Sequence, residues 1–224
     1  AKATLAALKL TNHVGGTLPG FIAEVIDPAF LGDIAKPEQI VFITGTNGKT
    51  TTNNLLNDLL VDNGYQTVTN RVGGNISSGF ASSFAKNATW KGTSKTKLAV
   101  MEFDELSGPR IFPYLQPDIL SVTNLFRDTF SRSATPDYVF DVMDKGIPAS
   151  THLILNADDM ISCRLAPQCT HRTYYSIARL AEDTAEPVGI VSDLTACPKC
   201  GGKLKWDYAH LRHLGHATCE ECGY

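Results

Sequence analysis

The sequence predicts an α/β fold, in which helices cover both faces of a parallel β-sheet and a small four-cysteine zinc ribbon is inserted after it. Three observations carry this prediction. An apolar run leads into a glycine-rich turn and then into a helical pattern at Ile40–Thr52. Further apolar runs alternate with helical patterns at intervals of about 20 to 30 residues, which is typical of a parallel sheet. Two Cys-x-x-Cys pairs follow near the end of the chain.

The turn after the first strand reads GTNGKT, from Gly45 to Thr50, and predicts a phosphate-binding loop. Its two glycines allow backbone conformations that a side chain would forbid, so successive amides converge on phosphate oxygens at the positive end of the helix dipole. Lys49 is expected on the β- and γ-phosphates of a nucleotide, and the Thr50 hydroxyl on Mg²⁺. The common phosphate-loop pattern has a further glycine where this chain has Ile43, so the loop is a tighter variant. A chance turn is the alternative.

The remaining elements follow from periodicity and turn residues. A helix is expected over 21–26, and an N-terminal helix around 5–10 is expected to pack on the sheet edge. The helix after the loop carries a leucine stripe that is expected to lie on the sheet, made by Leu55, Leu56, Leu59 and Leu60. A helix of small residues, suited to close packing, is expected from Gly73 to Ala85. Strands are expected at 66–69, 97–102, 118–122, 152–155 and 172–176.

Acidic side chains follow two of the predicted strands. Glu102, Asp104 and Glu105 come at the end of the strand at 97–102. Carboxylates at the carboxyl end of a strand in an open parallel sheet lie where ligands bind, and one of them would provide a Mg²⁺ contact opposite Thr50. Solvated acids at a loop start are the alternative. The NADD run ending at Asp159 follows the strand at 152–155, and N-capping of a helix at 160–165 is its expected role.

The cysteine spacing predicts a metal site. Two CxxC pairs are separated by 18 residues, which is the spacing of a four-thiolate zinc site: Cys197, Cys200, Cys219 and Cys222. Disulfides are disfavoured in a cytoplasmic chain, and a redox CxxC occurs singly after a strand. His216 stays open as a substitute ligand, while Cys163 and Cys169 are expected to be free thiols. So small a ribbon buries little apolar surface, so zinc would supply much of its folding free energy.

Composition excludes several classes of protein. The 224 residues are 43% hydrophobic with a net charge of −3, which disfavours nucleic-acid binding as the main task. No apolar run reaches the roughly 20 residues of a membrane span and no signal peptide opens the chain, so a cytoplasmic protein without a membrane-spanning segment is expected. The chain starts at Ala1 and stops at Tyr224, and we expect a fragment. Its expected parts are an N-terminal segment (1–39), an incomplete ATP-binding domain (40–190) and the ribbon (191–224).

Taken together, these motifs resemble the Mur ligases, which use ATP to activate a carboxylate as an acyl phosphate. The TGTNGKTT run is similar to their ATP loop, which folylpolyglutamate synthases share. The GTLPG, E-x-D-E, NLFRD and NADD runs, with CPKC and CEEC, narrow the resemblance to MurT-type ligase subunits of lipid II isoglutaminyl synthase. The resemblance covers nearly all of residues 15–224, and the ribbon is its most specific part.

The resemblance implies a Mur ligase central domain in which Glu102 holds Mg²⁺ and Asn75 lies near the nucleotide phosphates. The implied ATP-binding set is Gly45, Thr46, Asn47, Gly48, Lys49, Thr50, Thr51, Asn75 and Glu102. The implied reaction amidates the D-glutamate α-carboxylate of the lipid II stem peptide, with ammonia supplied by the glutaminase subunit GatD. Catalytic residues are implied beyond Tyr224, so these residues alone are expected to bind ATP without amidating.

Two positions depart from the usual Mur pattern. Thr129 stands where many Mur ligases have a histidine for a second metal ion, and Met143 where many have a carbamylated lysine. Whether a second Mg²⁺ binds therefore stays open, and the carbamate is not expected. Two alternatives stay open: another amide ligase such as a folylpolyglutamate synthase, and a P-loop protein whose ribbon binds nucleic acid or a partner. The ribbon counts against the first, and the acidic net charge against the second.

Overall fold

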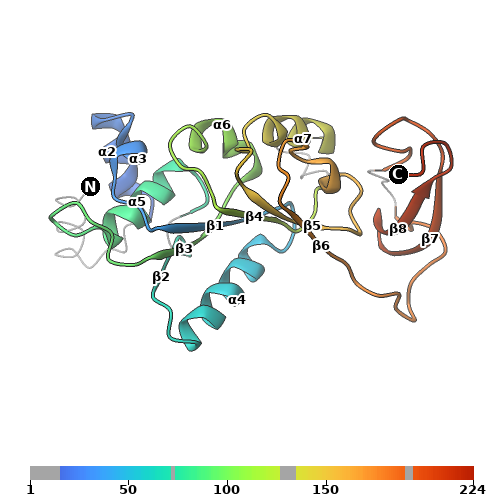
Figure 1. Cartoon of the computed structure of the whole chain (residues 1–224), viewed down its shortest axis with the longest axis horizontal. Coiled ribbons are helices and arrows are strands. Elements are labelled where there is room, and N and C mark those ends of the chain that lie inside the picture. The colour runs from blue at the N-terminus through green and yellow to red at the C-terminus, as the bar shows by residue number, and fades with distance from the viewer. Residues whose placement is uncertain (1–15, 72–73, 127–134, 190–193) are drawn as a thin grey trace.

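The computed structural model describes residues 16–71, 74–126, 135–189 and 194–224. Within these residues, six strands form a parallel sheet in the order β2-β3-β1-β4-β5-β6, and two more form an antiparallel hairpin (Figure 1). The sheet strands are β1 (Gln39–Thr44), β2 (Thr67–Thr69), β3 (Leu98–Glu102), β4 (Ile119–Val122), β5 (His152–Asn156) and β6 (Arg172–Tyr175). The hairpin strands are β7 (Leu204–Leu211) and β8 (Leu214–Cys219). The predicted fold class is confirmed.

Helices cover the two faces of the sheet unequally. In Figure 1, α4 (Lys49–Asp62) lies on one face, and the other helices among the described residues lie on the opposite face: α2 (Leu18–Ile26), α3 (Phe30–Asp33), α5 (Ser77–Asn87), α6 (Gly108–Ile111) and α7 (Pro136–Asp144). The connection from β1 to β2 runs one way along the sheet, whereas the later connections run the other way. Because parallel crossovers are right-handed, connections that run in opposite directions place their helices on opposite faces.

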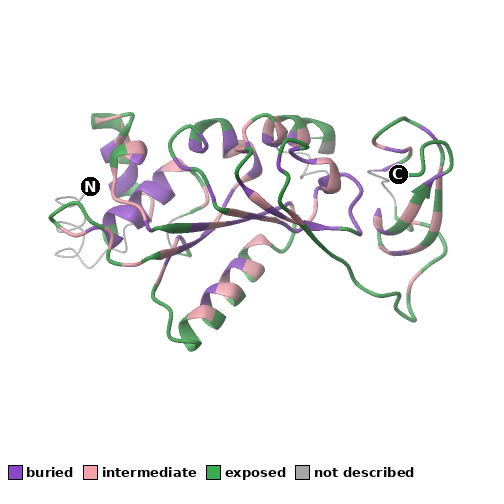
Figure 2. Ribbon diagram, viewed as in Figure 1, coloured by how far each residue is buried: buried purple, intermediate pink, exposed green. Residues whose placement is uncertain are grey.

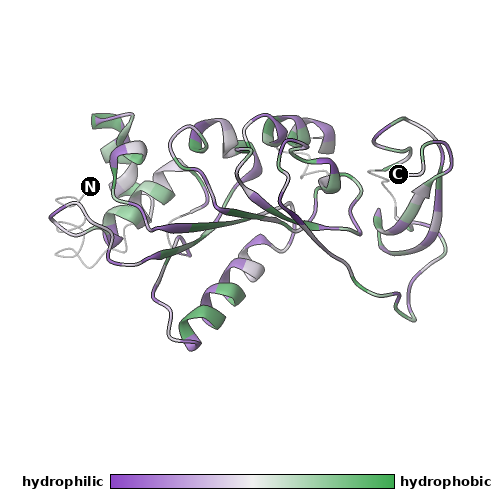
Figure 3. Ribbon diagram, viewed as in Figure 1, coloured by the Kyte–Doolittle hydropathy of each residue, from purple (hydrophilic) through white to green (hydrophobic). Residues whose placement is uncertain are grey.

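The hydrophobic core lies between the sheet and the helices on its more densely covered face. Aromatic rings from β1, α5 and the segment after β3 pack there, with Phe42 lying 5.2 Å from Phe80 and 5.5 Å from Phe103 between ring centroids. Phe112 continues the row at 5.1 Å from Phe103. Figures 2 and 3 show the central strands of the sheet as largely buried and hydrophobic, whereas the edge strand β6 is mostly exposed. This packed face supports the carboxyl edge of the sheet, where the candidate site lies.

The helix of small residues packs closely against α2, as predicted. The backbone amide of Gly20 donates to Ser82 Oγ at 2.8 Å, and a Cβ at residue 20 would lie 2.0 Å from the carbonyl oxygen of Ser78. The described helix begins at Ser77, and the predicted start at Gly73 lies outside the described residues, as does the expected N-terminal helix around 5–10.

The prediction that the leucine stripe of α4 lies on the sheet is wrong for Leu55 and Leu59. The helix buries Asn53 and Asn57, and Leu56 and Leu60 are half-buried, whereas Leu55 is 69% exposed and Leu59 is 58% exposed. Asn57 Oδ1 accepts a hydrogen bond from Thr67 Oγ1 of β2 at 2.6 Å. At 3.6 residues per turn these asparagines lie on the same side of the helix as Thr50. Directing Thr50 to the loop edge therefore turns Leu55 and Leu59 outward.

The helix predicted at 160–165 does not form. Only a single 3₁₀ turn, Ser162–Arg164, is present there, and Ala166 has a positive φ of 46° immediately before Pro167. A proline disfavours the α conformation in the residue before it, and the chain has left the helical region by Ala166, after this one turn. The turn itself has no side-chain cap, and Asp159 Oδ1 instead accepts from the amide of Ile161, the residue before the turn, at 3.0 Å.

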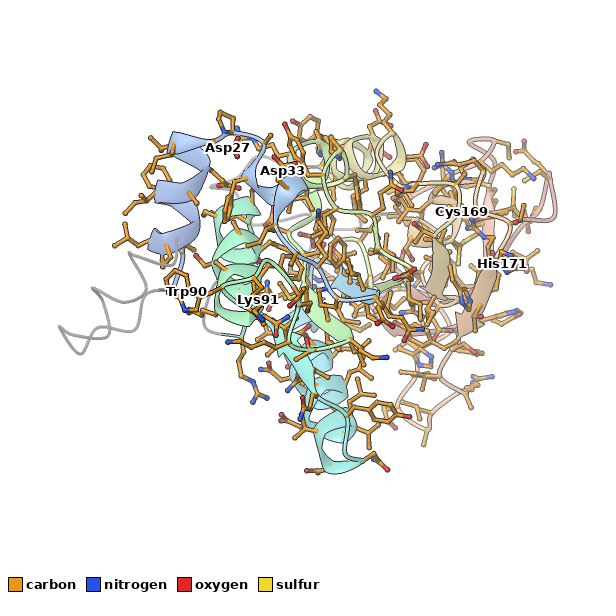
Figure 4. The ribbon with its side chains drawn as sticks, turned by 60° about the vertical axis from the view of Figure 1, so that its left-hand side comes forward. Asp27, Asp33, Trp90, Lys91, Cys169 and His171 are labelled. Atoms are coloured by element: carbon orange, nitrogen blue, oxygen red, sulfur yellow. The ribbon has the colours of Figure 1, made fainter. Side chains whose placement is uncertain are left out.

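The β7–β8 hairpin lies beyond the β6 edge of the sheet (Figure 1). The segment that leads to it pairs with the hairpin, since Thr184 and Ala209 exchange backbone hydrogen bonds and Asp183 Oδ1 lies 2.7 Å from His210 Nδ1. Figure 4 shows Cys169 and His171 on the segment that enters β6, far from Asp27 at the end of α2. Among the described residues, no helix combines the length and the apolar character that crossing a membrane requires.

Candidate functional site

The predicted phosphate loop lies at the carboxyl end of β1, between β3 and β4. The chain reverses its direction along the sheet at this point, and open α/β sheets bind ligands at such positions. Gly45 has a φ of +124°, and a Cβ there would lie 2.1 Å from Thr123 Oγ1. Gly48 has a φ of +82° and precedes the first residue of α4. The loop amides therefore lead directly into the positive end of a 14-residue helix.

A network of hydrogen bonds seats this loop on the segment after β4. The Thr46 amide donates to the carbonyl of Asn124 at 2.8 Å, and the Asn47 amide donates to Asn124 Oδ1 at 3.0 Å. The Thr46 hydroxyl accepts from the amide of Phe126 at 2.9 Å and donates to its carbonyl at 3.2 Å. Thr123 Oγ1 lies 2.7 Å from the carbonyl oxygen of Asn47. We call residues 123–126 the loop bed, because they determine where the loop backbone lies.

Lys49, the first residue of α4, points across the loop towards β3. Its Nζ lies 3.0 Å from Glu105 Oε1, and both side chains are largely buried. Burial raises the pKa of the Glu105 carboxyl, and the Lys49 ammonium opposes that rise. The 3₁₀ turn Glu105–Ser107 that carries Glu105 is capped by Asp104, whose side chain accepts from the amide of Leu106 at 3.1 Å. The ion pair holds the ammonium beside the loop backbone.

Thr50 and Glu102 are in contact, although they come from different elements. The Thr50 hydroxyl donates to Glu102 Oε2 at 2.7 Å, and the side-chain amide of Asn75 donates through Nδ2 to Glu102 Oε1 at 3.1 Å. The backbone of Glu102 is clamped by Asn70, which accepts from its amide at 2.8 Å and donates to its carbonyl at 2.7 Å. Neighbouring ligands of an octahedral Mg²⁺ lie about 3 Å apart, so this oxygen pair fits the ion.

The fold brings most of the predicted nucleotide residues to one edge of the sheet. Thr51 lies exposed in the first turn of α4. Thr129 lies outside the described residues. Met143 is fully buried in the hydrophobic core, where a carbamate would have no place.

Sequence reasoning assigned no role to Asn70 or to the loop bed, and gave Glu105 a weaker claim than Glu102. Thr123 and Asn124 follow β4 directly, so their position at a strand end was the available signal. Asn70 likewise follows β2. The pairing of Glu105 with Lys49 depends on the turn after β3, for which the sequence carries no comparable signal.

The four cysteines of the two CxxC pairs come together at the far end of the hairpin. Their sulfur atoms all lie within 4.8 Å of one another, with Cys197 Sγ 3.7 Å from Cys222 Sγ and Cys200 Sγ 3.5 Å from Cys219 Sγ. Four sulfurs around one zinc ion at about 2.3 Å lie about 3.8 Å apart, so the cluster has the dimensions of a tetrahedral zinc site.

Backbone amides also prepare the sulfur atoms for a cation. Amides of Glu221 and Cys222 donate to Cys219 Sγ at 3.4 and 3.5 Å. The Cys222 amide is the main reason that the pKa of Cys219 is lowered to about 7. The Gly202 amide lowers the pKa of Cys200, but the neighbouring Cys222 and Cys219 sulfurs outweigh it and raise that pKa to about 12. Four crowded thiols thus ionise together only around a positive charge.

The histidines of the ribbon contact other groups. His216, the predicted alternative ligand, lies with its Nδ1 2.6 Å from Asp207 Oδ2, and His210 lies against Asp183. Cys163 and Cys169 are free thiols, as predicted, and each sulfur lies 3.2 Å from a backbone carbonyl oxygen.

Comparisons with known proteins agree with this geometry. The Mur ligase middle domain matches residues 43–193. The lipid II isoglutaminyl synthase (glutamine-hydrolyzing) subunit MurT of Staphylococcus aureus strain COL is 36% identical over 230 aligned residues, which cover 100% of this chain and 50% of that protein. The subunit of the same name from Streptococcus pneumoniae is 35% identical, covering 93% of this chain and 46% of the relative. The chain thus spans about half the length of these curated relatives.

Solved structures show the same architecture. A pseudomurein peptide ligase type C from Methanothermus fervidus superposes with a TM-score of 0.64 and 25% identity, covering 89% of this chain and 38% of that one. MurF from Acinetobacter baumannii has a TM-score of 0.50 at 18% identity, covering 62% of this chain and 31% of that one, and shows the fold alone. With a matching middle domain, a shared fold and relatives aligned along its whole length, the chain belongs to the Mur ligase family.

Proposed function

We propose that this chain is the ATP-binding part of a ligase that amidates the α-carboxylate of D-glutamate in the stem peptide of lipid II, giving D-isoglutamine. The reaction proceeds through an acyl phosphate, and a glutaminase subunit of the GatD type supplies the ammonia. Support comes from the MurT relatives along the whole chain and from the Mur ligase middle domain. Because the chain spans about half of those relatives, the activity is proposed for the whole protein, acting from the cytoplasm on a lipid-linked substrate.

The single observation that carries the proposal is the contact between Thr50 and Glu102 beside the phosphate loop. In this proposal the loop amides bind the phosphate oxygens of ATP at the amino end of α4. Lys49 leaves its contact with Glu105 for the β- and γ-phosphates, where its charge stabilises the transferring phosphoryl group. Thr50 and Glu102 hold Mg²⁺, which neutralises developing phosphate charge when bound. Asn75 orients the Glu102 carboxylate through its amide.

Zinc has a structural role in this proposal. The four cysteines would supply all four ligands of a tetrahedral zinc site, which would leave no ligand position for substrate. The metal then stabilises the residue 191–224 ribbon, which has few core residues of its own. The boundaries at 39/40 and 190/191 are proposed as the limits of the ATP-binding domain.

Amidation by the full-length protein tests the proposal. Full-length protein, its glutaminase subunit, glutamine, ATP, Mg²⁺ and lipid II are combined, and conversion of the carboxyl to the amide is followed by mass spectrometry together with phosphate release. Lys49→Ala is expected to abolish both products. Lys91→Ala removes an exposed lysine in the loop after α5, visible in Figure 4, and is expected to leave both unchanged.

The Mg²⁺ assignment has its own variant pair. Glu102→Gln is expected to raise the Mg²⁺ concentration needed for half-maximal activity by about tenfold, because a neutral amide is a weaker ligand than a carboxylate. Glu38→Gln is the matched control, since Glu38 is exposed and directly precedes β1, at the opposite edge of the sheet. Amidation by Lys49→Ala at the wild-type rate, or identical Mg²⁺ dependence of both glutamine variants, contradicts the proposal.

A further inference from the structure

The turn of the ribbon hairpin reaches the loop bed, although the zinc cluster lies at the opposite end of the hairpin. Leu204 pairs with Cys219 at the cysteine end, and Leu211 pairs with Leu214 at the turn. The eight residues of β7 span about 25 Å between these ends. The turn residue His213 is 1% exposed, so it is buried against the rest of the protein rather than on the ribbon surface.

His213 contacts two residues that determine the position of the loop bed. Its ring lies 4.5 Å from the ring of Phe126 between centroids, and its Nε2 lies 3.4 Å from Asp159 Oδ1. The guanidinium of Arg212, the neighbouring residue, lies over the Phe126 ring at 5.6 Å from its centroid. The amide of Gly215 donates to the carbonyl of Asp158 at 2.9 Å, which fixes the turn on the NADD segment.

Asp159 joins this turn to the phosphate loop. Its carboxylate is fully buried, and Oδ2 accepts a hydrogen bond from the amide of Leu125 at 2.7 Å. The next residue, Phe126, exchanges two hydrogen bonds with the Thr46 hydroxyl of the phosphate loop. Direct contacts therefore connect His213 to Thr46, either through Phe126 or through Asp159 and the segment 125–126, and these connecting residues are buried. A fully buried carboxylate is costly unless its position is well defined by partners, so movement of His213 changes where Asp159 and Leu125 lie.

We propose that His213 is a positioning residue for the phosphate loop, so that the zinc-organised hairpin is a working part of the nucleotide site and not only a stabilising clip. The proposal rests on the proposed function, because it assumes that the loop binds ATP. With His213 in place, the hairpin turn holds Asp159 and Phe126, which hold Leu125 and Thr46. Without it, the loop amides lose part of their fixed geometry towards phosphate, while the cysteine cluster at the distant end of the hairpin stays intact.

Isothermal titration of the zinc-loaded full-length protein with magnesium and a non-hydrolysable ATP analogue tests this positioning role. His213→Ala is expected to raise the dissociation constant about tenfold, which corresponds to the loss of about one hydrogen bond to a charged oxygen. His216→Ala is the matched control, because His216 lies on the same hairpin, is exposed and contacts Asp207 and Tyr208 of β7. Its dissociation constant is expected to stay at the wild-type value.

Stoichiometry separates a positioning role from a merely structural one. A destabilised protein binds fewer equivalents at an unchanged dissociation constant, whereas a displaced loop binds one equivalent more weakly with zinc content unchanged. If His213→Ala does not fold, His213→Phe keeps a ring against Phe126 and removes the contact with Asp159, and the same weakening is expected. A dissociation constant equal to that of His216→Ala, or reduced stoichiometry alone, overturns the inference.

The proposed function is read out in the same experiment. Wild-type protein that takes up no nucleotide overturns the proposed function together with this inference. Wild-type binding that Lys49→Ala weakens and His213→Ala leaves unchanged overturns only the positioning role.

Discussion

Replacing Gly45 by alanine tests how closely the phosphate loop is seated on the loop bed. Alanine at a φ of +124° costs about 1–3 kcal/mol in backbone strain. The new Cβ would lie 2.1 Å from Thr123 Oγ1 and 2.8 Å from the carbonyl oxygen of Asn124. The Thr123 hydroxyl would have to give up its contacts with the carbonyls of Thr44 and Asn47, at about 1 kcal/mol each. The total is about 3–5 kcal/mol.

A loop relieves such strain by moving, and its amides then no longer converge on phosphate. Losing one or two hydrogen bonds to charged oxygens lowers ATP affinity roughly 100-fold. Titration calorimetry measures the affinity, and urea unfolding measures the stability. Gly92→Ala is the control, because Gly92 has a φ of +78° with no atom within 4 Å of an added Cβ, so it costs only about 1–2 kcal/mol of strain. ATP affinity in Gly45→Ala within about threefold of Gly92→Ala would refute the reasoning.

Three further predictions concern the ribbon, the buried ion pair and the outward face of α4. Cys219→Ser is expected to lose zinc and to have a lower melting temperature, because three thiolates hold the ion less tightly than four. Metal analysis measures the zinc content, and retention of one zinc per chain contradicts the prediction. Burial raises the pKa of Glu105 despite the opposing Lys49 charge, so the stability of the wild-type protein should fall as pH rises from about 4.5 through the raised pKa. Glu105→Gln should remove this pH dependence of the unfolding free energy, measured by urea titration. Unfolding free energies that change with pH in the same way in both proteins contradict the prediction. Leu59→Gln should cost less than about 0.5 kcal/mol, against about 3–5 kcal/mol for Phe80→Ala; similar costs would mean that the leucine face is buried.

Local sequence patterns were sufficient for the parallel sheet and for the order of its elements. Each sheet strand is an apolar run bounded by turn residues, and such a run needs burial whatever surrounds it. The short helix at 160–165 did not form although a capping candidate and apolar spacing were present, because Pro167 disfavours the α conformation in Ala166 and the chain turns there. Local signals therefore predicted element type well and predicted the extent of short elements poorly.

The leucine stripe of α4 shows where periodicity misleads. Its spacing is that of an amphipathic helix, and periodicity alone turns the leucines to the sheet. The helix instead begins at a loop that has to aim Lys49 and Thr50 at the sheet edge, and this determines the rotation of every later residue. Asn53 and Asn57 consequently meet the strands, and Leu55 and Leu59 face outward.

The sequence by itself determined the chemical groups of both candidate sites, because a Gly-x-x-Gly-Lys-Thr turn and paired CxxC knuckles are short motifs whose residues act within a few positions of one another. Only the tertiary structure decided which distant groups complete them. Glu102 and Glu105 reach the loop because parallel strands end at the same edge, and His213 reaches Asp159 because the hairpin folds back on the NADD segment. Contacts between residues more than 50 positions apart depend on strand order and crossover handedness, which no local pattern encodes.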